Sequence, residues 1–451
     1  MADVVSSTPA PAVEAPANGT VKFDEMEQFT AYGSLYSMAI LCLIVGGYRS
    51  VHFVQRHVTK KKGIETSLST REAMKFPFTA SFVLFGLYCF FNFNKVFGYV
   101  SAYLPLKVIE IVNRLNSTST ADVLNVTESP ENVVGVRALI KKALVYMPEI
   151  NKSNVMFVLL LLLCWEGCVA LASILKPFFQ VFLRRLPIGD RQPRRNIPYL
   201  ISFKSGKKEM DEGDIEDAKN DDTEYLMKIE FDSHDLVCIA VCLWVGISHL
   251  YQRHWITNNL LGIAFSIYGI ENLHLTSFKA GTWLLAGLFV YDVFWVFGTE
   301  VMTTVAKGID APILLQFPLD IYRNGWLEAD KYAMLGLGDI VIPGIFVALL
   351  RRFDHRIGQK SEGKKSQKSR CYFVITMFAY AFGLFITMGV MHYFKAAQPA
   401  LLYLVPSCVL IPLCVAAIRG EAGELWNYTE ETFTEAHQSK QKKKAMEKKT
   451  Q

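Results

Sequence analysis

Two apolar segments, KAGTWLLAGLFVYDVFWVFGTEVMTTVA (residues 279–306) and YAMLGLGDIVIPGIFVALL (residues 332–350), each contain one aspartate, Asp292 and Asp339. A carboxylate at bilayer depth costs about 2.5–3.5 kcal/mol even on the mildest scale, so it normally faces protein or a water-filled cavity and has a function. Two such acids in neighbouring spans indicate a functional pair.

The pair suggests a chemistry. If the two spans pack antiparallel, the carboxyl groups lie at similar depth. Two carboxylates held close together cannot both ionise easily, so they share a proton. One acid can then act as a base on water while the other donates a proton to a scissile carbonyl, which is aspartyl peptidase chemistry. Intramembrane acids also serve as proton or ion relays, so a multispan transporter is the alternative.

Three short motifs follow one another beside the apolar segments: Tyr291-Asp292, Gly336-Leu337-Gly338-Asp339 and Gln398-Pro399-Ala400-Leu401. In longer form they read FVYDVFWVFGT, LGLGDIVIPG and QPALLYLVP. This set, in this order, resembles the GxGD intramembrane aspartyl proteases and in particular the signal peptide peptidase family. The motifs span residues 291–401, and the surrounding apolar framework extends the likeness over most of residues 31–420.

The resemblance implies that Asp292 and Asp339 are the catalytic acids, supported by Tyr291, Gly336, Leu337 and Gly338. It also implies that Gln398, Pro399, Ala400 and Leu401 lie near them and help to form the substrate site. The implied substrates are membrane-spanning peptides with a lumen-facing C-terminus, chiefly signal peptides left after signal peptidase cleavage. Presenilin-like enzymes are the near rival, but they have the opposite orientation and a large loop between the catalytic spans.

The residues around the second acid fit close approach of a substrate. Gly336 and Gly338 leave room beside Asp339 for a peptide backbone, although small residues also serve helix packing. Pro343 lacks a backbone N–H, so it frees a carbonyl in the same span and favours a kink there.

The composition indicates a membrane protein. Of the 451 residues, 51% are hydrophobic and the mean hydropathy is +0.23, which is too apolar for an ordinary soluble chain. We expect an all-α, polytopic fold of about nine transmembrane helices within residues 31–420, between a disordered lumenal tail (1–30) and a basic cytosolic tail (421–451). The expected spans cover about residues 31–54, 76–93, 155–183, 236–249, 256–273, 279–303, 332–350, 371–394 and 399–418.

Loop charges set the orientation. The three strongly basic loops follow the first, third and seventh expected spans, so they share one side, and the positive-inside rule makes that side cytosolic. The N-terminus is then lumenal and the C-terminus cytosolic. The sequons at Asn18, Asn116 and Asn125 become lumenal and are candidate glycosylation sites. Lys448 and Lys449 near the C-terminus match a dilysine retrieval signal, which predicts residence in the endoplasmic reticulum membrane.

Other classes of function lack a signature. No cysteine pair in a hydrophilic loop has zinc-site spacing and no His-Glu-x-x-His occurs, so we expect neither a metal nor a cofactor. The basic residues act as orientation signals rather than as a nucleic-acid surface. The expected partners are the lipid bilayer and membrane-spanning peptides. A homo-oligomer and a purely scaffolding role are left open by the sequence.

Glycan mapping tests the orientation, because only lumenal sequons are modified. We expect glycans within the set Asn18, Asn116 and Asn125, and none on Asn427. Single Asn→Gln variants, compared by gel mobility with and without glycosidase treatment, give the answer. A glycan on Asn427, or on a sequon inserted between residues 351 and 370, would reverse the orientation and favour the presenilin-like alternative.

Overall fold

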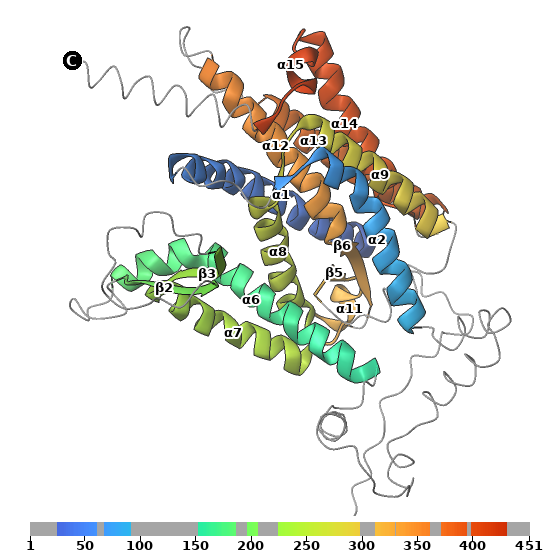
Figure 1. The fold of residues 1–451 in the computed structure, drawn as a ribbon. Helices are drawn as coiled ribbons and strands as arrows, with labels where there is room; N and C mark the ends of the chain where they lie inside the picture. The colour runs from blue at the N-terminus through green and yellow to red at the C-terminus, as the bar shows by residue number, and fades with distance from the viewer. Residues whose placement is uncertain are drawn as a thin grey trace, which may run out of the picture.

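The computed structural model describes residues 25–60, 67–91, 152–185, 196–205, 224–297, 312–329, 331–360, 371–394 and 398–430. Helices dominate these ranges (Figure 1). The candidate glycosylation sites Asn18, Asn116 and Asn125 and the candidate retrieval signal Lys448-Lys449 lie outside them.

The long helices of the described ranges are α1 (Glu25–Lys60), α2 (Thr70–Phe91), α6 (Lys152–Arg184), α7 (Ser233–Gln252), α8 (Trp255–Asn272), α9 (Phe278–Phe297), α12 (Gly338–Lys360), α13 (Cys371–Phe394) and α14 (Leu401–Ile418). Two short helices are α11 (Ile321–Asn324) and α15 (Ala422–Trp426). The strands are β1 (Ser67–Leu68), β2 (Pro198–Ser205), β3 (Glu224–Asp232), β4 (His274–Leu275), β5 (Leu314–Pro318) and β6 (Tyr332–Gly336).

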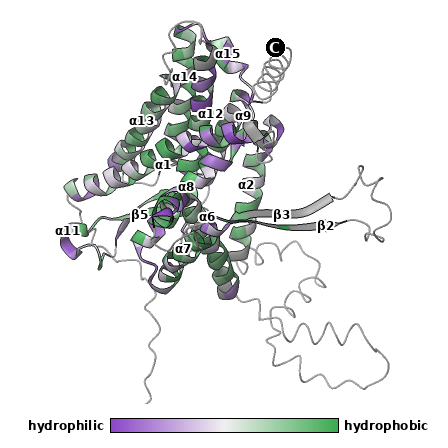
Figure 2. Ribbon diagram, turned by 90° about the vertical axis from the view of Figure 1, so that its left-hand side faces the viewer, coloured by the Kyte–Doolittle hydropathy of each residue, from purple (hydrophilic) through white to green (hydrophobic). Residues whose placement is uncertain are grey.

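Each expected span coincides with one long helix. Within the described part of the chain, six helices are long and apolar enough to cross a membrane, namely α1, α6, α7, α9, α13 and α14. Helices α2, α8 and α12 coincide with the other three expected spans. Apolar residues predominate along the helices of the bundle (Figure 2). The total of nine spans stays a prediction.

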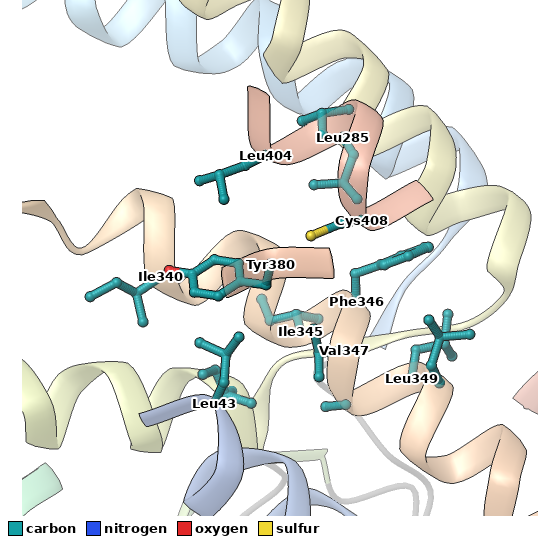
Figure 3. Close-up of a cluster of buried hydrophobic side chains, with 14 of the residues drawn as sticks. Leu43, Leu285, Ile340, Ile345, Phe346, Val347, Leu349, Tyr380, Leu404 and Cys408 are labelled. Carbon is teal, nitrogen blue, oxygen red and sulfur yellow. The ribbon is translucent and has the colours of Figure 1, made fainter. Parts of the chain in front are cut away.

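Helix α12 forms the centre of the bundle. Residues 343–350 are all buried, and a helix that is apolar on every face belongs in the interior. It packs against α1, α8, α9, α13 and α14. Figure 3 shows this core: Ile340, Ile345, Phe346, Val347 and Leu349 of α12 lie among Leu43, Leu285, Tyr380, Leu404 and Cys408 from four other helices. The helix carrying Asp339 is therefore fixed by packing.

Helices α6 and α7 form a second layer against α8. Their shared core contains Cys164, Cys168, Cys238 and Cys242, with Leu261 contributed by α8. Lys176 of α6 binds Asp232 and Asp235 at the start of α7 at 3.0 and 2.8 Å. That ion pair lowers the pKa of Asp232, which lies just before α7.

Among the described residues, three two-stranded sheets interrupt the helices, and the sequence did not predict them. The β1–β4 sheet is parallel, and the β2–β3 and β5–β6 sheets are antiparallel. The β5–β6 pairing corrects one expected span. Residues 332–336 pair with residues 314–318 as strand β6, so the helix carrying Asp339 begins at Gly338 rather than near Tyr332. The physical reason is that β5 supplies backbone partners that an extended segment needs.

Both expected tail boundaries also shift. Helix α1 begins at Glu25, so the helical chain starts before residue 31. At the other end, Tyr428 is buried and the Glu430 N–H donates to the Thr276 carbonyl at 2.8 Å. Glu430 also pairs with Arg352 of α12, whose guanidinium donates to the Ser50 hydroxyl at 2.6 Å. Residues 421–430 are thus part of the helical core rather than of a tail.

One close approach of helices can be tested by a pair of glycines in α13. A Cβ placed on Gly383 would lie 3.1 Å from the Leu404 Cα and 3.3 Å from the Tyr403 carbonyl oxygen, and backbone cannot move aside cheaply. Gly383→Ala should destabilise the protein by about 1–3 kcal/mol. The control is Gly389→Ala, because a Cβ there meets nothing within 4 Å and alanine favours helix by up to about 1 kcal/mol. Thermal unfolding in detergent measures both; equal shifts would contradict the close packing.

Candidate active site

Asp292 lies in the second half of α9 and is 5% exposed. Its Oδ2 accepts a hydrogen bond of 3.1 Å from the backbone N–H of Leu401, the first residue of α14. The first N–H groups of a helix have no partner within the helix, so the start of α14 is a natural donor to an acid. The structure thereby brings the last expected motif into direct contact with the first.

Asp339 lies in the first turn of α12 and is half-buried. The turn before it is fixed from both directions. The Leu337 N–H donates to the Ile313 carbonyl at 3.1 Å, and the Leu337 carbonyl accepts from the Val341 N–H at 2.8 Å. The hairpin and the helix thus meet at Leu337, and the acid follows two residues later.

Asp292 and Asp339 lie close enough for their charges to interact. One acid lies in the interior of α9 and the other at the start of α12, and these two helices pack together. The structure therefore brings the acids of the first two motifs near one another, while the antiparallel pairing of their spans stays a prediction. Such a pair can hold a shared proton and act on a water between them.

Two asparagines of α8 hold the hairpin that leads to Asp339, and sequence reasoning missed them. The Asn259 side chain accepts from the Gln316 N–H at 2.8 Å and donates to the Gln316 carbonyl at 2.5 Å. The Asn258 side chain donates to the Leu314 carbonyl at 2.7 Å. Both side chains are buried. The sequence did contain a signal for them, because two adjacent amide side chains in an apolar span need hydrogen-bond partners within the protein.

The two glycines of the second motif differ. A Cβ on Gly336 would lie 3.3 Å from Asp339 Oδ2, so the glycine leaves room for the Asp339 carboxyl group. Gly338 is exposed and a Cβ there meets nothing within 4 Å. The space beside the Gly338 backbone is therefore open. Between them, the Leu337 side chain points to Gly262 of α8, which anchors the motif to its neighbour.

Tyr291 packs at the edge of two apolar clusters. It is half-buried and packs near Trp295, with ring centroids 6.4 Å apart, beside Leu84, Leu87 and Tyr88 of α2. Its contacts support α9 from the α2 side.

The residues before α14 form a break between helices. Pro399 is buried, and Gln398 and Ala400 are half-buried. The carbonyls of Pro399 and Ala400 accept the N–H groups of Leu402 and Leu404 at 3.2 and 3.1 Å. Proline is well tolerated just outside a helix start, and the arrangement leaves the Leu401 N–H for Asp292.

Tyr380 of α13 is a further residue at the site that the sequence did not single out. It is fully buried, and its hydroxyl donates to the backbone carbonyl of Asp339 at 3.1 Å. No motif contains it. In the described residues, no group of three or more His, Cys, Asp or Glu side chains could hold a metal ion.

Comparison with known proteins identifies the family. A family model described as signal peptide peptidase matches residues 59–432. The chain belongs to the signal peptide peptidase family. It is 51% identical over 449 residues to intramembrane protease 2 of Caenorhabditis elegans, covering 94% of this chain and 96% of that one. It is 38% identical over 400 residues to the human signal peptide peptidase, covering 89% and 83%. No solved structure matches.

Membership of this family confirms the resemblance noted in the three motifs and the helical, multispan fold class. It also gives the general activity, which is intramembrane proteolysis. The roles of individual residues are not given by the comparisons and stay predictions.

The two glycines give a test of the site. Gly336→Ala should press on the Asp339 carboxyl and lower kcat, because the built Cβ contact is only 3.3 Å. Gly338→Ala should leave the unliganded protein intact and instead raise KM, because its methyl group occupies the open space beside the acid. Steady-state cleavage of a helical peptide in detergent, together with thermal unfolding, separates the two effects. An identical change of kcat and KM in both variants would contradict this division of roles.

Proposed function

We propose that this protein is an intramembrane aspartyl endopeptidase that cleaves transmembrane segments within the bilayer. Its proposed substrates are chiefly leftover signal peptides and type II-oriented membrane helices. The observation that supports this most directly is the meeting of two acids from separate helices, one of them bound by the backbone of the Pro399-Ala400-Leu401 segment. Ionisable residues inside membrane segments are costly and usually functional, which supports a role for both acids.

In this proposal the two acids divide the work of hydrolysis. One carboxylate removes a proton from water while the other, protonated, donates to the carbonyl oxygen of the scissile bond. The attack gives a tetrahedral intermediate, whose C–N bond breaks as the leaving nitrogen takes up a proton. The Leu401 N–H restricts the rotation of the Asp292 carboxyl group, so its free oxygen is held in one direction. Such positioning lowers the entropic cost of the reaction.

The substrate backbone must be exposed before it can react. A transmembrane helix hides its carbonyl groups in internal hydrogen bonds, so the scissile bond needs a locally extended conformation. The open space beside Gly338 is next to Asp339 and lacks a side chain that would block a backbone. We therefore infer that the extended part of the substrate passes Gly338.

The proposed location is the endoplasmic reticulum membrane, with a lumenal N-terminus and a cytosolic C-terminus. The positive charge of the loops after α1, α6 and α12 supports this orientation, because these loops lie on one side of the membrane if the nine expected spans are counted. Lys448 and Lys449 are the proposed retrieval signal. If they serve this purpose, replacing both with Ser lets glycans mature beyond the high-mannose form, and unchanged glycans would reject the assignment.

Asp292→Asn and Asp339→Asn should each abolish cleavage, because neither acid of a shared-proton pair can act alone. We expect a loss of at least about a hundredfold, the lower range for removing an acid–base group. The thermal midpoint should stay the same or rise, since a neutral amide is less costly than a buried acid. Cleavage of a signal-peptide substrate by the purified protein is the measurement.

Asp354→Asn is the matched control, because Asp354 is a fully buried acid of the same helix α12. Its carboxylate accepts the N–H groups of Tyr372 and Phe373 at 3.1 and 2.8 Å, which fixes the start of α13. This variant should lose stability yet keep its turnover per folded molecule. Near-normal cleavage by either Asp292→Asn or Asp339→Asn would show that the aspartyl assignment is wrong.

A further inference from the structure

The sequence removes one hydrogen bond from the start of α12. In an α-helix, the carbonyl of each residue accepts the N–H of the residue four positions later. For Asp339 that residue is Pro343, which has no N–H. The backbone carbonyl of a candidate catalytic acid thus lacks its ordinary helical partner, and a buried carbonyl without a partner is costly.

A side chain from another helix supplies the replacement. The Tyr380 hydroxyl donates to the Asp339 carbonyl at 3.1 Å, across 41 positions of sequence. Tyr380 is 0% exposed, so its hydroxyl is shielded from solvent. Figure 3 shows its ring among Ile340, Leu404 and Cys408, which hold it in place.

The same helix also connects Asp339 to Asp292. One turn after Tyr380, Gly383 brings α13 so near to α14 that a Cβ would lie 3.1 Å from the Leu404 Cα. Helix α14 begins at Leu401, whose N–H binds Asp292. One hydrogen bond therefore ties Asp339 to α13, and another ties Asp292 to α14. These two helices are closely packed on one another.

We propose that Tyr380 is a positioning residue for Asp339, which replaces the backbone donor that Pro343 removes and so sets the place of the acid relative to Asp292. This inference rests on the proposed function, because positioning matters only if Asp339 takes part in the reaction. Tyr380 itself touches neither the substrate nor the water in this scheme. Its hydroxyl acts through the backbone of α12.

A double-mutant cycle tests the proposal. Tyr380→Phe removes only the hydroxyl, and it should lower kcat about tenfold with little change of KM, because small displacements of a reacting group are costly. Pro343→Ala supplies the backbone N–H that donates to the Asp339 carbonyl in an ordinary α-helix. In the Pro343→Ala background, Tyr380→Phe should therefore change kcat by less than about twofold, since the carbonyl already has a backbone partner.

The matched control is Tyr372→Phe in both backgrounds. Tyr372 is also a fully buried tyrosine of α13, but its hydroxyl donates to Glu421, away from Asp339. Its effect on kcat should be the same with Pro343 present as in the Pro343→Ala background. The thermal midpoints of the same variants report the Tyr380 bond without relying on cleavage: Tyr380→Phe should lower the midpoint more with Pro343 present than in the Pro343→Ala background.

The outcomes separate this inference from the proposed function. If Tyr380→Phe lowers kcat equally in both backgrounds, or does not lower it with Pro343 present, the positioning role is rejected, whatever the Asp→Asn variants do. If Asp339→Asn keeps its cleavage activity, the proposed function fails, and the positioning role fails with it. Loss of cleavage in both Asp→Asn variants together with a background-dependent effect of Tyr380→Phe supports both.

Discussion

A carboxyl group taken out of water loses its hydration, and Asp292, 5% exposed between α9 and α14, has to recover part of that loss from protein. The Leu401 N–H, at 3.1 Å, provides a hydrogen bond, and it is available only because α14 begins there. Asp339 recovers its part from the start of α12, where the positive end of a helix favours a negative charge. Both acids therefore depend on helix starts, which is why the chain must break at Pro399 and at Leu337.

Such breaks are expensive in a bilayer, because non-helical backbone is tolerated there only when protein or a water-filled cavity surrounds it. The β5–β6 hairpin meets this condition through the Asn258 and Asn259 side chains of α8, which take up backbone groups of Leu314 and Gln316. Helix α8 is thus structural support for the site although it contributes no acid. The same condition explains why α12 is central: a helix that begins at an irregular segment needs neighbours on every side.

The sequence predicted the features that depend on neighbouring residues and missed those that depend on residues far away in the chain. The apolar runs indicated the nine long helices of the described ranges, since length and hydropathy are local properties. The order of the three motifs indicated the family. Strand β6 was missed because Tyr332–Gly336 is as apolar as the span it precedes, and only pairing with β5 makes it extended. Residues 421–430 read as a polar tail because the burial of Tyr428 depends on distant partners. The need for a donor such as Tyr380 had an indirect signal, because Pro343, four residues after Asp339, removes the N–H that would bind the Asp339 carbonyl.

The two acids occupy different surroundings, and this difference bears on their roles. Asp292 lies within a helix whose own backbone is already paired, so its side chain is held by a donor from another element. Asp339 lies at a helix start, where the first N–H groups lack helical partners. Because Pro343 removes a donor, the Asp339 carbonyl is held by Tyr380, and the turn before it is held by the backbone bonds of Leu337. One acid is fixed through its carboxyl oxygen and the other through its backbone. A change at the Leu401 N–H therefore acts directly on the Asp292 carboxyl group, whereas a change at the Tyr380 hydroxyl acts on Asp339 only through the backbone of α12.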